Sequence, residues 1–393
     1  MATQTTNEEI APDHKYPGYT EEAHPELFDR RAMLPQPSEL KPGQLPASQI
    51  KEYFENGYTV VEKFFTEAEL EPVRACVNGV VDDLAQKLYK AGKIPELYAE
   101  YGFLERLTKV EAAFPGACII CSKLGAVPQA LKDLWANERL LNVIEQLIGP
   151  DIAGNPAWNL RTKVPNNSVT TVPWHQDVSY LDNDTYRMLI PTVWIPFVDS
   201  TAENGCLEVM DKGHRTGKVA THQCCYGDTF YTILEEAEME RTLGVNMERD
   251  RRTLPVKSGG FILFNNVILT GACRTCPRHI RWSLDLRWQR ASDPAGLWEL
   301  KNGVVMRKGS DPHFKVDWTE FDSVNRPLYA DGVCEGRQGG PDGRGIRHDD
   351  PRTVDEKMGH RTHEQTRSIN RSRRRWSPSR ATPRDRHVAA HSA

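Results

Sequence analysis

The stretch "IRWSLDLRW" (Ile280–Trp288) decides the fold, because its residues alternate strictly between apolar and polar. Its apolar members are Ile280, Trp282, Leu284, Leu286 and Trp288, and its polar members are Arg281, Ser283, Asp285 and Arg287. Successive side chains of a β-strand point to opposite faces. The pattern therefore predicts a strand whose apolar face packs against helices and whose polar face lines an interior. An edge strand with one solvated face is the alternative.

Two polar residues of this strand form a candidate anion site. Arg281 and Ser283 lie two residues apart and so share a face. A guanidinium beside a hydroxyl is well suited to binding a carboxylate, since the guanidinium offers parallel N–H donors in a fixed plane.

A second motif, "WHQDVSY" (Trp174–Tyr180), contains His175 and Asp177. In a strand these two side chains point to the same face. An imidazole and a carboxylate side by side provide two of the three corners of a 2-His-1-carboxylate iron site. Taken alone, the three residues fit equally a surface histidine and aspartate near a turn.

The rest of the chain indicates one α+β, mainly β domain between a polar arm and a basic tail. Residues 1–45 are polar and proline-rich and are predicted to be an extended arm, whereas 332–393 are too poor in apolar residues to build a core. Between them, helical patterns at 67–90 and 128–147 precede many short strands. This order favours an antiparallel barrel or jelly roll over 46–331 with helices packed outside.

The bulk properties exclude several classes of protein. Apolar residues make up 39%, charged residues 26%, and the net charge is -4, which gives no argument for nucleic-acid binding despite the arginine-rich tail. No apolar run approaches the roughly 20 residues that span a bilayer, and no secretory signal is evident. We therefore predict a cytoplasmic protein with reduced thiols and no membrane or nucleic-acid partner; a peroxisomal address stays open.

Taken in order, the motifs resemble the phytanoyl-CoA dioxygenase family of iron(II)- and 2-oxoglutarate-dependent oxygenases. The resemblance spans roughly residues 52–318 and includes both motifs above. It also includes "ENGYTVVEKFFTEAEL" (55–70), "VWIPFVDSTAENGCLEVMDKGHRTG" (193–217) and "GGFILFNN" (259–266). It implies a double-stranded β-helix core that resembles the jelly rolls of cupins.

The resemblance also implies roles for individual residues. His175 and Asp177 correspond to iron(II) ligands, and Arg281 corresponds to the anchor for the distal carboxylate of 2-oxoglutarate, assisted by Ser283. Asn159, Lys163 and Trp194 fall where relatives line the cosubstrate pocket, and His214 belongs to a structural turn. The implied reaction consumes O2, converts 2-oxoglutarate to succinate and hydroxylates a small organic molecule, with ascorbate as an optional reductant.

The expected second histidine ligand is missing. In the family it lies eleven residues before the arginine that binds 2-oxoglutarate, and counting back from Arg281 gives Thr270. A neutral hydroxyl is a poor iron(II) ligand. Two interpretations accept the residue as it stands: Cys273 or His279 compensates, or the chain is a non-catalytic relative that retains the fold and binds 2-oxoglutarate.

A third interpretation is a reading-frame slip in the gene record. Reading the codons of residues 270–277 one base earlier, with permitted third bases, gives His-Arg-Arg-Val-Pro-Asn-Val-Ser, which restores a histidine and the family's Pro-Asn-x-Ser. Residues 353–367 read one base later likewise give a sequence typical of a folded protein. We favour this interpretation, although the polypeptide as written still lacks the ligand.

Other metal sites are weaker candidates. Cys118-x-x-Cys121 and Cys273-x-x-Cys276 have the spacing of zinc ligands, but "ACIICS" (117–122) is an apolar run typical of buried structure. His222, Cys224 and Cys225 fall in a predicted loop over the barrel mouth. We therefore predict neither a zinc site nor a second metal site.

Overall fold

The computed structural model describes residues 22–165, 167, 170–224, 231–273, 279–297 and 302–324. The chain divides into two units, Met1–Val333 and Cys334–Ala393, and every described residue belongs to the first. The predicted basic tail (332–393) and the codon segment at 353–367 therefore lie outside the described residues, as do Cys225 and Cys276.

The described helices precede most of the strands, as predicted. The α-helices are α1 (Ala47–Asn56), α2 (Glu67–Lys90), α3 (Arg106–Ala113), α4 (Ala117–Ser122), α5 (Gln129–Trp135), α6 (Glu138–Ile148), α7 (Glu236–Glu238), α8 (Met247–Asp250) and α9 (Thr319–Ser323). Short helical turns are η1 (Pro25–Leu27), η2 (Arg30–Ala32), η4 (Asp177–Tyr180), η5 (Asn183–Arg187) and the π-helical η7 (Met239–Leu243).

All strand pairs among the described residues are antiparallel. The strands are β1 (Tyr58–Val61), β2 (Ile152–Gly154), β3 (Asn159–Lys163), β4 (His175–Gln176), β5 (Thr192–Pro196), β6 (Leu207–Met210), β7 (Gln223–Cys224), β8 (Thr232–Ile233), β9 (Arg251–Leu254), β10 (Phe261–Phe264), β11 (Leu269–Ala272), β12 (Arg281–Arg290) and β13 (Val304–Arg307). The large sheet has the order β1-β10-β5-β12-β2-β13, with β3 also paired to β12, and the small sheet has the order β4-β11-β6-β9.

Strand β12 lies in the middle of the large sheet, so the alternative of a solvated edge strand is wrong. It pairs with β5 along one side and with β3 and β2 along the other. Both its faces are buried from Arg281 to Gln289. On the apolar face, the Trp282 ring stacks on Phe103, with ring centroids 5.8 Å apart. Both predicted faces are therefore buried, and α6 contacts the strand.

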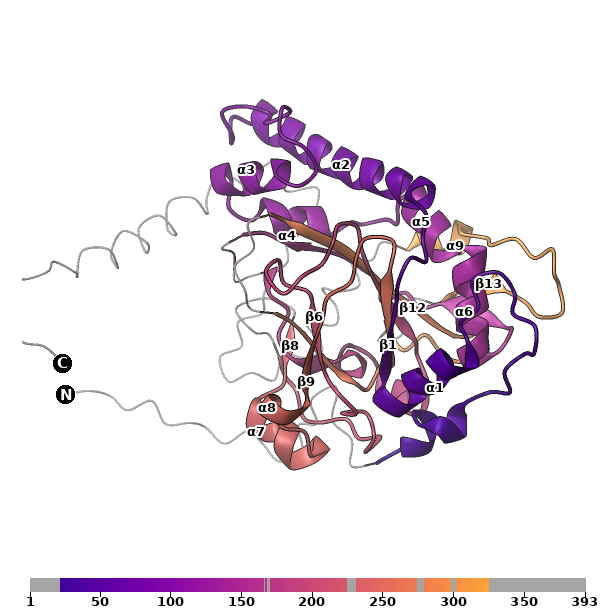
Figure 1. Ribbon diagram of the computed structural model, residues 1–393. Helices are drawn as coiled ribbons and strands as arrows, with labels where there is room; N and C mark the ends of the chain where they lie inside the picture. Colours follow the sequence, from indigo (N-terminus) through magenta and orange to yellow (C-terminus); the bar gives the residue numbers. More distant parts are fainter. Residues whose placement is uncertain are drawn as a thin grey trace, which may run out of the picture. The chain divides into compact units, whose positions relative to one another are not determined.

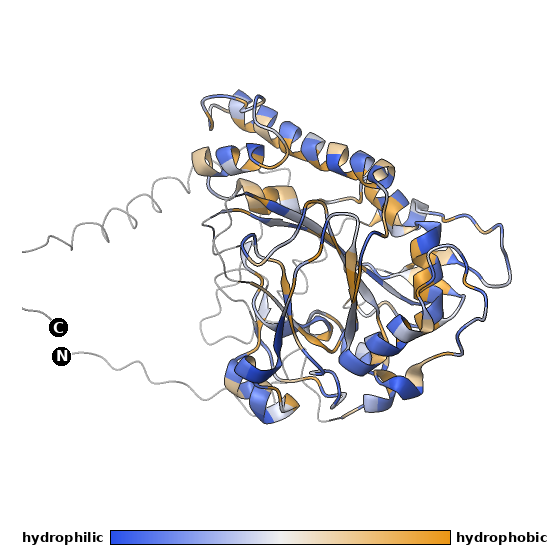
Figure 2. Cartoon of the chain, in the orientation of Figure 1, coloured by the Kyte–Doolittle hydropathy of each residue, from blue (hydrophilic) through white to orange (hydrophobic). Residues whose placement is uncertain are grey.

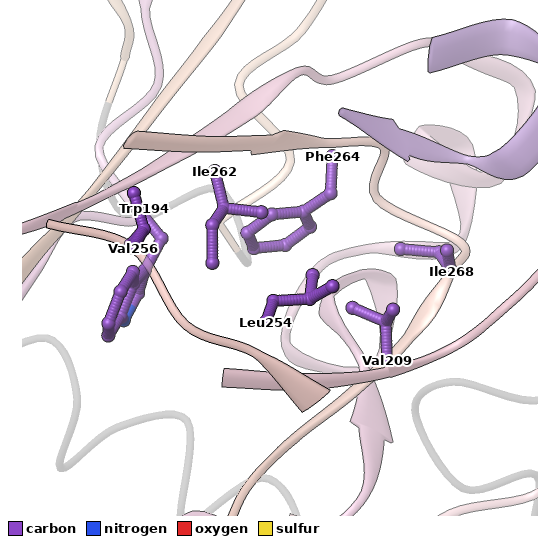
Figure 3. Packing of buried hydrophobic residues seen from close by; sticks show 7 residues of the cluster. All are labelled: Trp194, Val209, Leu254, Val256, Ile262, Phe264 and Ile268. Carbon is purple, nitrogen blue, oxygen red and sulfur yellow. The ribbon is translucent and has the colours of Figure 1, made fainter. Parts of the chain in front are cut away.

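The two sheets pack against each other through apolar side chains. Trp194 and Ile262 from the large sheet share a buried cluster with Val209 and Leu254 from the small sheet (Figure 3). The apolar contact closes one part of the space between the sheets, and the polar face of β12 lines another part.

Helices cover the outer side of the large sheet. Helix α2 runs along α3, α4 and α5, and α6 contacts β2 and β12 (Figure 1). Hydrophobic and hydrophilic residues alternate around these helices, as in amphipathic helices with one packed side (Figure 2). The predicted helix 67–90 is confirmed, and its first turn is capped by the Glu69 carboxylate, which accepts a hydrogen bond from the Thr66 N–H at 2.7 Å.

The single helix predicted at 128–147 is wrong, because the chain forms two helices there. The Asn137 side chain accepts hydrogen bonds from the N–H groups of Arg139, at 3.0 Å, and Leu140, at 3.2 Å. An asparagine that satisfies these free donors starts a new helix, α6, even though the apolar pattern continues across the break.

We expect Asn137→Ala to lower the free energy of unfolding by about 1 kcal/mol, the usual value of an N-cap. Chemical denaturation followed by circular dichroism measures the loss. Asn137→Ser retains an oxygen acceptor and should recover most of the stability; equal losses in both variants would show that the cap contributes little.

The described part of the N-terminal arm contacts the domain. Its Phe28 side chain is fully buried, and the His24 N–H donates to the Gly217 carbonyl at 3.0 Å. Among the described residues, no helix is both long and apolar enough to cross a membrane.

Candidate functional site

His175 lies on the two-residue strand β4 and is 4% exposed. Its Nδ1 lies 2.8 Å from the Pro173 carbonyl oxygen. A carbonyl can only accept, so Nδ1 carries the proton and, in the neutral ring, Nε2 presents a lone pair. This backbone contact is the usual way in which a protein sets the tautomer of a metal-binding histidine.

Asp177 begins the turn after β4, and its two carboxylate oxygens have different surroundings. Oδ2 accepts hydrogen bonds from the Thr192 hydroxyl at 3.0 Å and from Arg287 Nε at 2.8 Å. Oδ1 is buried and has no hydrogen-bond partner among the described residues when His175 is neutral. Burial by itself raises the pKa of Asp177, but the charge and hydrogen bond of Arg287, together with His175 in its protonated form, outweigh it and hold the pKa well below its usual range.

The free oxygen of Asp177 points at the free nitrogen of His175. Asp177 Oδ1 and His175 Nε2 lie 3.3 Å apart, and both side chains are almost fully buried. In the neutral tautomer these are two acceptors facing each other, an arrangement that a shared cation stabilises. Neighbouring corners of a coordination sphere with bonds of about 2.1 Å lie about 3 Å apart, so the pair fits a metal ion.

Thr270 occupies the position where a third ligand would be needed. It lies on β11 directly opposite His175 in the antiparallel register, and it is 2% exposed. Directly opposite residues have their side chains on the same face, with Cβ atoms about 5 Å apart. The position predicted by counting back from Arg281 therefore adjoins His175, and it carries a hydroxyl instead of an imidazole.

Neither proposed substitute for the missing ligand reaches the site. The His279 side chain is 57% exposed and lies 4.0 Å from Glu105, so it faces away from the interior. The Cys273 N–H donates to the Cys206 carbonyl at 3.1 Å, one register step beyond β11. In the part of the chain that the structure describes, no three His, Cys, Asp or Glu side chains converge on a metal position.

The other candidate metal residues have structural environments. Both nitrogens of the buried His222 are used: Nδ1 contacts the Ala220 carbonyl at 2.8 Å, and Nε2 accepts from the Gln176 N–H at 3.0 Å. Burial lowers the pKa of His222 to about 3. Cys118 and Cys121 are buried in α4, where burial raises the pKa of Cys121 to about 12, so its thiol stays protonated.

Arg281 is a buried guanidinium with few partners among the described residues. The side chain is 4% exposed, its Nη1 donates to the Ser283 hydroxyl at 2.6 Å, and its guanidinium lies 5.2 Å from the centre of the Trp194 ring. Its Nε is buried, and no described residue forms a hydrogen bond with it. Burial lowers the pKa of Arg281 to about 10, which still leaves the group charged at pH 7.

The three further residues expected around the cosubstrate all lie beside β12. Lys163 pairs with Arg281 in the β3–β12 register, and Asn159 and Trp194 both pair with Asp285. Lys163 Nζ donates to the Thr171 hydroxyl at 3.4 Å, and burial together with the Arg281 charge lowers the pKa of Lys163 to about 8. Two cations therefore lie side by side at this end of the strand.

His214 has the structural environment that was expected. Its Nε2 contacts the Phe54 carbonyl oxygen at 3.1 Å, and burial lowers its pKa to about 4. Between pH 4 and 6.5 the unfolded chain thus binds a proton that the native chain does not, so stability falls as the pH falls through this range.

We expect His214 to make the free energy of unfolding about 1 kcal/mol lower at pH 5.5 than at pH 7.5. His214→Gln retains an N–H donor for the Phe54 carbonyl and should remove this part of the pH dependence. Urea denaturation of the parent and of His214→Gln at the two pH values measures the contribution of His214. The contribution of His222 is the same in the two proteins and cancels in the difference. An unchanged pH dependence in the variant would contradict the assignment.

Sequence reasoning missed the role of Arg287 and the partner of Asp285. Arg287 binds Asp177, and Asp285 accepts from Arg161 Nε at 2.9 Å. Both lie on the polar face that the alternation of β12 defines, so their burial could be predicted. Their partners lie more than a hundred residues away in sequence, and nothing local identifies them.

The comparisons with known proteins agree with this geometry. A family model described as Phytanoyl-CoA dioxygenase (PhyH) matches residues 53–275, which include His175, Asp177 and Thr270. The chain belongs to the phytanoyl-CoA dioxygenase family. The match ends six residues before Arg281, so it does not include Arg281 or Ser283. No curated protein matches the sequence.

Several solved structures are similar to the chain. The non-heme monooxygenase ThoJ shares 16% identity, with 73% of this chain and 96% of that chain covered and a TM-score of 0.46. EctD from S. alaskensis, with 2-oxoglutarate and 5-hydroxyectoine, shares 17% identity, with 78% and 89% covered and a TM-score of 0.44. The α-ketoglutarate-dependent carbocyclase SnoK shares 14% identity, with 65% and 88% covered and a TM-score of 0.40.

Proposed function

We propose that the two sheets form a double-stranded β-helix built for iron(II)- and 2-oxoglutarate-dependent hydroxylation of a small organic molecule, and that Thr270 impairs this activity. The observation that carries the proposal is the register of β4 and β11, in which Thr270 lies opposite His175. The same interior contains the facing acceptors of His175 and Asp177, and the guanidinium of Arg281, whose Nε has no hydrogen-bond partner among the described residues. Membership of the family supports the reaction class.

Each polar group of the interior has a separate task in this proposal. His175 Nε2 and Asp177 Oδ1 would hold the iron, which supplies the activation of O2 when bound. Arg281 and Ser283 would bind the distal carboxylate of 2-oxoglutarate by charge-assisted hydrogen bonds. Lys163 adds a second positive charge beside Arg281, and Trp194 packs on the guanidinium and keeps water from it.

The missing ligand sets the expected behaviour of the chain as it stands. Two protein ligands bind a metal ion more weakly than three and constrain its position less. We expect 2-oxoglutarate to bind and iron(II) to bind weakly, with succinate formation close to the metal-free background. Anaerobic titration with iron(II), followed by a succinate assay in air, tests this. Tight iron binding with rapid succinate formation by the unaltered chain would contradict the impairment.

A non-catalytic 2-oxoglutarate-binding protein is the second candidate, and the unpaired Nε of Arg281 favours it equally. The two candidates differ in the effect of saturating iron(II). An impaired enzyme forms succinate slowly at high iron concentration, whereas a binding protein forms none at any concentration.

We also propose that the natural gene encodes a histidine at position 270, and that the residues from there to Pro277 result from a frame slip. Sequencing the transcript across the codons for residues 264–288 tests this. A histidine codon followed by Pro-Asn-x-Ser supports the slip, and a threonine codon in the printed frame rules it out.

A further inference from the structure

The carboxylate of Asp177 is held by two residues of the large sheet that face each other. Thr192 on β5 and Arg287 on β12 are directly opposite in the register. Both direct their donors at the same oxygen of Asp177, which lies on a different part of the chain, immediately after β4. The contact therefore connects the sheet that carries Arg281 to the turn that carries the candidate ligands.

Oδ2 of Asp177 is saturated by this arrangement. It accepts hydrogen bonds from Thr192 Oγ1 at 3.0 Å and from Arg287 Nε at 2.8 Å, and Arg287 Nη2 lies 2.7 Å from it in the ion pair. The remaining guanidinium nitrogen, Nη1, donates to the Ala157 carbonyl at 2.6 Å. The Arg287 side chain is 5% exposed and that of Asp177 is 2% exposed, so water competes little with these bonds.

Arg287 and Arg281 are thus two buried arginines on one face of one strand, and they differ in how many of their nitrogens have partners in the protein. All three nitrogens of Arg287 lie within 2.8 Å of protein oxygens. Arg281, by contrast, donates to the Ser283 hydroxyl, and its Nε has no hydrogen-bond partner within the described part of the chain. Arg281 can accept an anion from outside the protein. Arg287 cannot, because its charge is already neutralised by Asp177.

We propose that Arg287 is a positioning residue that makes Asp177 a ligand through one oxygen only. With Oδ2 held by two hydrogen bonds and the ion pair with Arg287, Oδ1 alone is free to meet a metal ion beside His175 Nε2. This inference rests on the proposed function, since it assigns a task to Arg287 in the same metal site. It also places both the cosubstrate anchor and the support for the metal ligand on β12.

The chain offers a matched control in a second buried Arg–Asp pair. Arg161 on β3 donates from Nε to Asp285 Oδ2 at 2.9 Å, and the two side chains are 11% and 8% exposed. This pair has similar chemistry and burial but does not touch His175 or Asp177. Removing Arg161 therefore measures the general cost of breaking a buried ion pair in this domain.

The test is anaerobic titration of the full-length chain with Co(II). The parent and Thr270→His are each titrated alone, then with Arg287→Met added, and then with Arg161→Met added. We expect Arg287→Met to weaken Co(II) binding about 10- to 100-fold, as loss of a residue that orients a metal ligand does. Arg161→Met should change it less than about 3-fold, although both variants lower the melting temperature.

Two further readouts keep the inference testable if Arg287→Met does not fold. Thr192→Val removes one donor from Oδ2 at little cost in volume and should weaken Co(II) binding several-fold. In Thr192→Val or Arg287→Met, the released Oδ2 can also bind the metal, which raises the coordination number of Co(II). Because Co(II) absorbs visible light more weakly at higher coordination number, the visible absorption of the bound ion should fall. Arg287→Lys retains the charge and should restore part of the affinity.

The outcomes separate this inference from the proposed function. If Thr270→His binds Co(II) and neither Arg287→Met nor Thr192→Val weakens binding or alters the spectrum, the positioning role is wrong while the metal site stands. Equal weakening by Arg161→Met would likewise overturn it, because the effect would then be structural. If Thr270→His binds no Co(II), the proposed metal site itself is wrong, and this inference is wrong with it.

Discussion

Thr270→His is expected to bind iron(II) on the order of 100-fold more tightly than the parent chain. Thr270 lies opposite His175 in the β4–β11 pair, so an imidazole there joins Nε2 of His175 and Oδ1 of Asp177 on one face of the metal. Loss of a supporting residue alone costs about 10- to 100-fold in metal affinity, and a direct ligand contributes at least as much. Anaerobic iron(II) titration measures the gain.

Thr270→Leu is the matched control for this gain. Leucine fills a volume similar to that of an imidazole but offers no lone pair, so it separates ligation from filling of space. We expect no gain in iron affinity in Thr270→Leu, and we expect His175→Ala to abolish the gain in Thr270→His. An equal affinity in the histidine and leucine variants would show that position 270 does not face the metal.

Arg281→Met is expected to weaken 2-oxoglutarate binding by about 100-fold. Truncating one partner of a buried, hydrogen-bonded charge pair costs about 2–5 kcal/mol, and the Nε of the buried Arg281 has no hydrogen-bond partner among the residues that the structure describes. Isothermal titration with 2-oxoglutarate measures the loss. Ser283→Ala should lose less, about 10-fold, because it removes only the hydroxyl that orients Nη1.

The stability of the ligand-free protein provides a second test of the same residue. A buried charge without a carboxylate partner destabilises the native state. Arg281→Met should therefore unfold at the same denaturant concentration as the parent or at a higher one. A clear loss of stability would show that Arg281 serves the fold, and retained 2-oxoglutarate binding would show that it is not the anchor.

Local patterns were sufficient to predict the elements whose two faces differ chemically. The alternation of "IRWSLDLRW" identified β12 and both its faces, and the pattern at 67–90 identified α2 with its bounds. The break at Asn137 was missed, since the apolar periodicity continues through it and only the cap geometry reveals the new helix.

The candidate site could be predicted only as far as the spacing of its residues allowed. The distance of two residues between His175 and Asp177 placed their side chains together, and counting back from Arg281 located Thr270. Pairing of β4 with β11 brings together residues 95 positions apart in the chain (175 to 270). The contact of Arg287 with Asp177 could not be predicted for the same reason, because the two residues are far apart in sequence. From the sequence alone, an arginine on the polar face of β12 could be solvated, paired with another residue or free.

The most direct test of the account is the crystal structure of Thr270→His grown without oxygen in the presence of iron(II) and 2-oxoglutarate, with an anomalous difference map at the iron edge. We expect one iron peak bound by His175 Nε2, Asp177 Oδ1 and the introduced imidazole, with the distal carboxylate of 2-oxoglutarate on Arg281. An iron peak elsewhere, or an imidazole that points away from His175, would contradict it.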